Sequence, residues 1–181
     1  MNLRNFLVSA AVATAAIAAG TAALADAPNT QTATVSGAAK IIRPITISAA
    51  GSLDFGTIVK PRTGGTAGTV TISNASTATR TPSGDLVTVG SSFSRPVYTI
   101  GGEGAQNYSL VVPASFDMTG SAGGTLTVTL TPSMAAGNHT FTGTVGSGAT
   151  DTLYMGASIP VSDTTTSGAY SGSFDVTVTY N

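Results

Sequence analysis

Residues able to carry out acid–base, nucleophilic or metal chemistry are few in this chain. His139 is the single histidine, and it lies in Gly137-Asn-His-Thr140, a pattern that predicts a solvated turn rather than a general base. Serines and aspartates are numerous, so counting alone leaves a Ser-His-Asp arrangement open. The sequence has, however, no Gly-x-Ser-x-Gly elbow between a strand and a helix.

Phosphate and metal sites are equally unsupported by spacing. The glycines of Gly143-Thr-Val-Gly146-Ser-Gly148 precede no helix that could complete a phosphate cradle. The aspartates Asp151, Asp163 and Asp175 are scattered rather than grouped as Ca²⁺ or Mg²⁺ ligands. Zinc would find no cysteine and one imidazole. We therefore expect no enzyme, no cofactor and no metal.

The remaining composition describes a weakly charged β protein. Charged residues make up 8% of the 181 residues, and the formal net charge is −1. With no basic patch to neutralise phosphates, we expect no nucleic-acid partner. A surface of Thr, Ser, Gly and Asn suits β-structure and close contact with neighbours. The absence of cysteine means that burial and hydrogen bonds alone must stabilise the fold.

The amino-terminal residues have the pattern of a targeting segment. Arg4, an apolar run over residues 6–19 and the small-residue site Ala23-Leu24-Ala25 predict a signal peptide cleaved after residue 25; the alternative is a buried Ala-rich helix. No other long apolar segment follows, so we expect a mature chain without a membrane span. It would pass through the periplasm to the cell surface or the medium.

The rest of the chain predicts an all-β fold, an antiparallel β-sandwich of about eight or nine strands in one domain over residues 42–181. The expected strands are short apolar runs separated by Gly, Ser, Pro and Asn. Turns are expected at Gly64-Gly65, Ser83-Gly84-Asp85, Gly101-Gly102 and Gly123-Gly124. Flexible loops are expected over residues 63–69 and 144–152. The expected strands include residues 45–47, 53–58, 70–72, 97–100, 108–112, 126–130, 141–145 and 153–159.

Both ends of the mature chain alternate in polarity. At the carboxyl end, Phe174, Val176, Val178 and Tyr180 share one face of the predicted last strand. We expect this to be the most regular strand and part of the core. The segment 26–41 alternates as well: it is either an ordinary first strand or a strand that leaves its own domain. The residues of its smaller or more apolar face are Ala33, Val35, Gly37, Ala39 and Ile41.

These two ends resemble the subunits of bacterial chaperone–usher pili. Such pilins carry a glycine fourteen residues from the carboxyl end and a penultimate tyrosine, and Gly168 and Tyr180 occupy those positions. The middle of the chain resembles spore coat U-like domains and an uncharacterised secreted bacterial family, domain of unknown function 4402. The matching pieces are Leu53-Asp-Phe-Gly56, Gly68-Thr-Val-Thr-Ile72, Tyr108-Ser-Leu-Val-Val-Pro113 and Gly168-Ala-Tyr-Ser-Gly-Ser-Phe174.

The resemblance implies an immunoglobulin-like sandwich that lacks one strand. A periplasmic chaperone would fill the open groove first, and the extension of the next subunit would replace it after passage through an outer-membrane usher. The physical basis is β-augmentation, in which main-chain hydrogen bonds supply affinity and alternate side chains supply register. Gly37 would lie where the groove is shallow.

We therefore expect a structural subunit of an extracellular pilus, fibre or surface coat of a Gram-negative cell, with copies of itself or related subunits as partners. The strand after Gly168 would line the groove or contact the chaperone, and the segment around Gly37 would be the donor. The alternative is a self-complete secreted β-sandwich that binds a surface ligand or a protein. Sugar sites stack aromatic rings; Trp is absent, and Tyr154 and Tyr170 are the candidates for that role.

Overall fold

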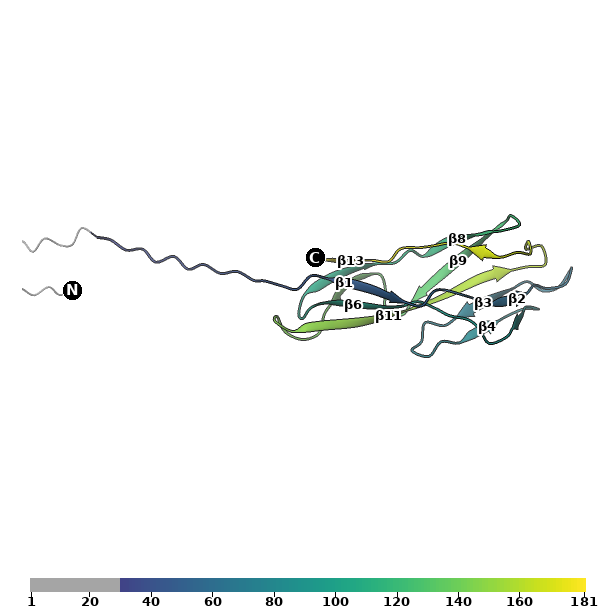
Figure 1. Cartoon of the computed structure of the whole chain (residues 1–181), viewed down its shortest axis with the longest axis horizontal. Coiled ribbons are helices and arrows are strands. Elements are labelled where there is room, and N and C mark those ends of the chain that lie inside the picture. Colours follow the sequence, from purple (N-terminus) through teal and green to yellow (C-terminus); the bar gives the residue numbers. More distant parts are fainter. Residues whose placement is uncertain (1–29) are drawn as a thin grey trace, which may run out of the picture. The chain divides into compact units, whose positions relative to one another are not determined.

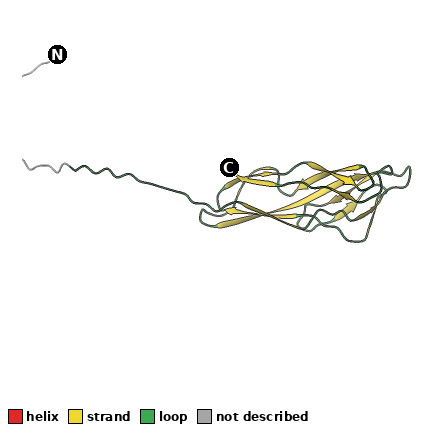
Figure 2. Cartoon of the chain, turned by 45° about the horizontal axis from the view of Figure 1, so that its top comes forward, coloured by secondary structure: helices red, strands yellow, loops and turns green. Residues whose placement is uncertain are grey.

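The computed structural model describes residues 30–181, which form thirteen β-strands and no helix (Figures 1 and 2). All strand pairs among them are antiparallel, which confirms the predicted all-β sandwich. The predicted signal peptide, residues 1–25, lies outside the described residues. The strands are β1 (Thr46–Ala50), β2 (Thr57–Val59), β3 (Gly68–Ile72), β4 (Arg80–Pro82), β5 (Val87–Val89), β6 (Val97–Glu103), β7 (Asn107–Val111), β8 (Ser115–Gly120), β9 (Thr125–Pro132), β10 (Gly137–Thr140), β11 (Gly148–Val161), β12 (Tyr170–Ser171) and β13 (Thr177–Tyr180).

The largest sheet has the order β1-β6-β11-β9-β8-β12, with β3 beside β11 and β4 beside β3. A three-stranded sheet has the order β10-β7-β13, and β2 pairs with β5. Strand β11 has 14 residues. Its first half pairs with β6, and its second half pairs with β3 and β9, so the large sheet curls along this strand.

The core follows the period-2 patterns of the sequence. In β9, Leu126, Val128 and Leu130 are buried while the intervening threonines are exposed, as alternation predicts. Tyr108 in β7 stacks on Phe141 with ring centroids 4.4 Å apart. The fully buried large side chains are Tyr108, Phe141, Ile72, Ile100, Leu110, Leu153, Met155, Glu103, Val70 and Val128.

The predicted turn at Gly101-Gly102 is wrong, because both glycines lie inside β6. A Cβ on Gly102 would overlap the ring of Phe141 and come within 2.7 Å of the Tyr180 hydroxyl oxygen. Here glycine permits close packing across the sandwich rather than a reversal of the chain.

Several boundaries around residues 137–152 are also corrected. His139 lies in β10, opposite Tyr108 of β7, and not in a turn. The predicted strand over 141–145 is absent because the chain turns after Phe141, where Gly143 has a φ of +99°. The predicted loop over 144–152 ends early, since β11 begins at Gly148. The loop predicted over 63–69 likewise ends where β3 begins, at Gly68.

The predicted continuous last strand is divided into β12 and β13, and the longest regular strand is β11 instead. The predicted alternation nevertheless holds. Phe174, Val176, Val178 and Tyr180 are half-buried and pack against the core, while the residues between them are exposed.

Candidate functional site

Seven strands of the described sandwich have a partner on one side only, namely β1, β2, β4, β5, β10, β12 and β13. Two of these, β1 and β13, are the first and the last of the described strands. Strand β1 pairs with β6, and β13 pairs with β7; no other described strand pairs with either. Neither strand contains a charged residue or a proline, although such residues commonly protect sheet edges from further pairing. By contrast, the short edge strand β4 contains Arg80 and Pro82.

The register of β13 identifies the main-chain groups on its open side. Asn181 donates its N–H to the carbonyl of Asn107 at 3.1 Å. Residues of an antiparallel pair alternate between facing their partner and facing away, so Thr177 and Thr179 also bond toward β7. The N–H and C=O groups of Val178 and Tyr180 therefore point to the side without a partner strand.

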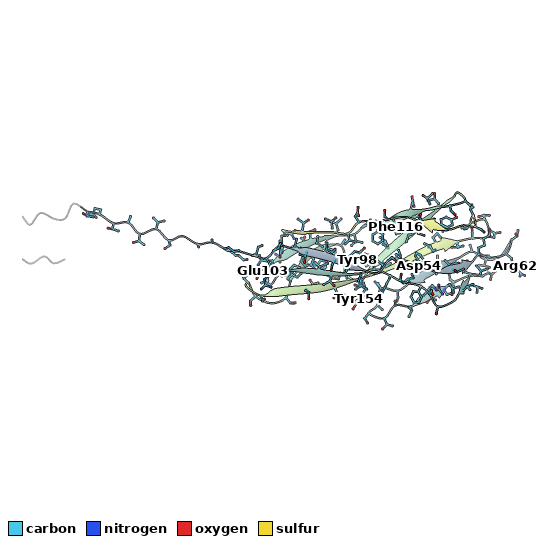
Figure 3. The ribbon with its side chains drawn as sticks, in the orientation of Figure 1. Asp54, Arg62, Tyr98, Glu103, Phe116 and Tyr154 are labelled. Carbon is cyan, nitrogen blue, oxygen red and sulfur yellow. The ribbon has the colours of Figure 1, made fainter. Side chains whose placement is uncertain are left out.

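Two adjoining hollows lie between residues 49–60 and residues 165–174, with volumes of about 520 and 480 Å³. Leu53, Asp54, Met118 and Tyr170 line both hollows, so we treat them as one groove, called here the edge groove. Asp54, Tyr98 and Phe116, which line one or both hollows, are labelled in Figure 3. The groove therefore lies between the chain that follows β1 and the chain that precedes β13.

The carboxyl-terminal wall of the edge groove combines small residues, mostly Ser, Thr and Gly, with the rings of Tyr170 and Phe174. The Phe174 ring lies 4.9 Å from the Phe116 ring, centroid to centroid. On the opposite side, Ala49 of β1 lines the second hollow. All five residues of β1 are exposed, and Ile47 is 36% exposed although it is a large apolar residue. Burial, together with the negative charge of Asp175, raises the pKa of Tyr98. The groove thus offers apolar side chains together with hydroxyl and main-chain groups.

A hydrogen-bonded cluster, called here the Glu103 clasp, joins the end of β13 to the chain before β1. The Tyr180 hydroxyl accepts the N–H of Glu103 at 2.7 Å and donates to the carbonyl of Arg43 at 3.0 Å. The Glu103 carboxylate is 2% exposed, accepts the N–H groups of Arg43 and Gly146, and lies 3.8 Å from Arg43 Nε. The clasp therefore holds both main-chain polar groups of Arg43.

The predicted donor residues lie in a segment without secondary structure. The residues 30–45 form no strand, and the first strand begins at Thr46. Ala33, Val35, Gly37, Ala39 and Ile41 are all exposed; Val35 and Ile41 are 89% and 90% exposed. Nothing lies within 4 Å of the position that a Cβ would take on Gly37. An ordinary first strand over these residues is thus not what the structure contains.

The residues predicted to line the groove or to contact the chaperone lie along the last part of the chain, from the segment before β12 to the end of β13. Gly168 precedes β12 and lines the first hollow, Phe174 lines the second, and Tyr180 belongs to the clasp. Val176 and Val178 lie between Phe174 and Tyr180 and pack against the core. The sequence prediction did not include Arg43 and Glu103 in the site. The only sequence feature that pointed toward them was the penultimate tyrosine, Tyr180, whose hydroxyl bonds main-chain groups of both residues.

Asp151, Asp163 and His139, which the sequence analysis considered for metal binding or catalysis, have structural partners. The Tyr108 hydroxyl donates to Asp151 Oδ2 at 2.7 Å, and burial and this carboxylate raise the Tyr108 pKa well above its usual range. Asp163 accepts the N–H of Gly64, and His139 contacts the carbonyl of Ala135 at 2.8 Å. Within residues 30–181, no three His, Cys, Asp or Glu residues are grouped as metal ligands.

The aromatic residues considered for ligand stacking have partners as well. Arg95, which is 7% exposed, places its guanidinium 4.7 Å from the Tyr154 ring centroid and donates to the carbonyls of Ser73 and Ser76. The Tyr170 hydroxyl donates to the carbonyl of Thr166 at 2.6 Å. Each of the two tyrosines therefore takes part in a contact that stabilises a loop.

Comparison with known proteins adds one match. No curated protein and no solved structure matches the chain. Across the described part of the chain, no helix is long and apolar enough to cross a membrane. A family profile described as "Domain of unknown function (DUF4402)" matches residues 45–180, which include every strand from β1 to β13. The chain belongs to this family.

Proposed function

We propose that this protein is a structural subunit of an extracellular pilus, fibre or surface coat. In this assembly, the extension of residues 26–41 of one copy adds as a strand to the edge groove of another copy. A periplasmic chaperone would occupy the groove during export, and an outer-membrane usher would exchange it for the next subunit.

The observation that carries this proposal is the pair of unprotected strand edges. Strands β1 and β13 each present an open edge, and the inward side chains beside β13 are apolar but only half-buried. A self-complete sandwich would cover these side chains and shield its edges. An added strand would satisfy the outward main-chain groups of Val178 and Tyr180 and would bury the half-exposed side chains.

The extension has the properties that such an added strand needs. Its residues 33–41 contain one charged side chain, that of Lys40, and alternate small or apolar residues with others. In extended form, nine residues span roughly 30 Å. Burying Val35 and Ile41, which are 89% and 90% exposed, would contribute about 1.5–3 kcal/mol each. Repetition of this head-to-tail contact gives an open fibre.

Removal of the extension tests the proposal. A variant that lacks residues 26–39 keeps the compact unit Lys40–Asn181 and its clasp. We expect it to be monomeric and to gain thermal stability when a peptide of residues 30–41 is added. At a peptide concentration of 100 times Kd, the gain should be about 2.7 kcal/mol. A peptide with Val35→Asp and Ile41→Asp is the matched control.

The competing function gives a different result in the same experiment. If the sandwich is a self-complete binding module, the shortened chain should melt like the full-length protein and should ignore the peptide. That result would refute strand complementation.

A further inference from the structure

The chain before β1 is held at one end of the sandwich. Arg43 uses its N–H on the Glu103 carboxylate and its carbonyl on the Tyr180 hydroxyl. Lys40 Nζ donates to Gln106 Oε1 at 3.0 Å, in the connection between β6 and β7. Residues 40 and 43 are thus both bonded where β6 ends and β7 begins.

Strand β1 then runs away from this end. Its first residue, Thr46, pairs with Gly101, and its last, Ala50, pairs with Val97. The edge groove begins near Ala49 and continues beyond it. Figure 3 shows Glu103 near one end of the sandwich and Asp54 farther along it.

For the extension to fill the groove of its own subunit, the chain would have to reverse just before β1. The reversal would fall on residues 40–45, which include Arg43, held by the clasp, and Pro44, whose ring fixes φ and removes a donor. Proline also restricts the residue before it to extended conformations. The clasp therefore opposes a reversal at Arg43, and the proline that follows favours an extended conformation of Arg43 itself.

We infer that the Glu103 clasp prevents the extension from filling the groove of its own subunit and so reserves that groove for a second copy. This inference rests on the proposed function. The extension of the same chain competes for the groove at an effective concentration of about 1 mM. This is roughly a thousandfold higher than the concentration of extensions from other subunits when the protein is at about 1 µM. A polymerising subunit therefore needs a structural barrier to self-filling, and the clasp lies at the required position.

The first test weakens the clasp in the protein expressed from its full-length sequence. The double variant Arg43→Ala/Tyr180→Phe loses the guanidinium and the hydroxyl that bonds the Arg43 carbonyl, but it keeps the aromatic ring and the main-chain N–H of residue 43 that bonds Glu103. We expect the share of closed monomers, which reject a labelled peptide of residues 30–41, to rise about tenfold over wild type at equal concentration. Size-exclusion chromatography with light scattering and peptide anisotropy measure this. The control variant Arg62→Ala removes an arginine outside the clasp and should assemble like wild type.

The second test leaves the clasp intact and bypasses it. A ten-residue Gly-Ser linker inserted after Ala39 gives the extension enough length to return, so we expect closed monomers here too. If the linker variant forms multimers like wild type, self-filling does not compete and the inference is refuted. Should the double variant fail to fold, the linker variant decides alone.

The two proposals fail differently. If the folded double variant forms multimers like wild type, the clasp inference is refuted and strand exchange stands. If wild type is monomeric and the chain without residues 26–39 ignores the peptide, strand exchange itself is refuted, and the clasp inference with it.

Discussion

The substitution Gly102→Ala tests how closely the two faces of the sandwich approach each other. Gly102 lies in β6, where a Cβ would overlap the Phe141 ring and come within 2.7 Å of the Tyr180 hydroxyl oxygen. Phe141 is 1% exposed and stacks on Tyr108, so its ring has little space to move. The Tyr180 hydroxyl can move only by weakening its two hydrogen bonds in the clasp.

These contacts set the expected loss of stability. Overpacking a core position costs about 1–3 kcal/mol, and each weakened hydrogen bond of the Tyr180 hydroxyl adds about 1 kcal/mol. The expected decrease in unfolding free energy is therefore about 2–5 kcal/mol. For a domain of this size, each kcal/mol lowers Tm by roughly 2–4 °C, so Tm should fall by roughly 5–20 °C.

The neighbouring Gly101→Ala is the matched control. It adds the same methyl group to the same strand, but the nearest atom to the new Cβ is the hydroxyl oxygen of Thr46, an exposed side chain that can rotate. Calorimetry or circular dichroism on both variants measures Tm. If Gly102→Ala melts within about 2 °C of Gly101→Ala, the close approach of Phe141 and Tyr180 to β6 is wrong.

Two further substitutions test the inward face of the chain beside β13 and the buried tyrosine. Val176→Asp should lower the unfolding free energy by at least about 2 kcal/mol because it places an unpaired carboxylate against the core, and the yield of soluble folded protein should fall several-fold. The control Thr177→Asp, on the outward face, should accumulate normally. Equal yields of the two variants would show that the wrong face was assigned. The folded-state pKa of Tyr108 is raised, so the unfolded chain loses that proton first and the unfolding free energy should decrease as pH rises above about 10. Urea denaturation between pH 8 and 12 should show a shallower decrease for Tyr108→Phe, and identical slopes would contradict the buried Tyr108–Asp151 pair.

The sequence predicted the strands whose side chains alternate in polarity. Strands β9 and β3 and the residues around β13 match the expected faces because one side of each is buried. Strand β10, with the sequence Gly137-Asn-His-Thr140, was missed because it has no apolar face. Its register depends on pairing with β7, which no local pattern reveals.

Glycine was the least informative signal. A Gly-Gly pair is compatible with a tight turn and also with close packing of two backbones or rings. At Gly101-Gly102 the second meaning applies, since Phe141 and Tyr180 approach β6 from segments 39 and 78 residues further along the chain. That distinction requires the topology.

The candidate site was predicted in the same uneven way. The alternating face beside β13 could be read from the sequence, but the clasp could not, because Arg43 and Glu103 are 60 residues apart. Isolated charges of this kind gain a role only when the fold brings them together. The penultimate Tyr180 was recognised as significant, whereas its two partners were not.

The placement of charge bears most directly on function. Charged residues make up 8% of the chain, which is too few to place one on every edge strand. The free edge strand β4 has Arg80 and Pro82, whereas β1 and β13 have neither charge nor proline. The edge strands β2, β5, β10 and β12 also lack Asp, Glu, Lys, Arg and proline, so the absence of charge alone does not single out β1 and β13. Unprotected edges favour uncontrolled pairing, and the partner strand that we propose would cover the edges of β1 and β13.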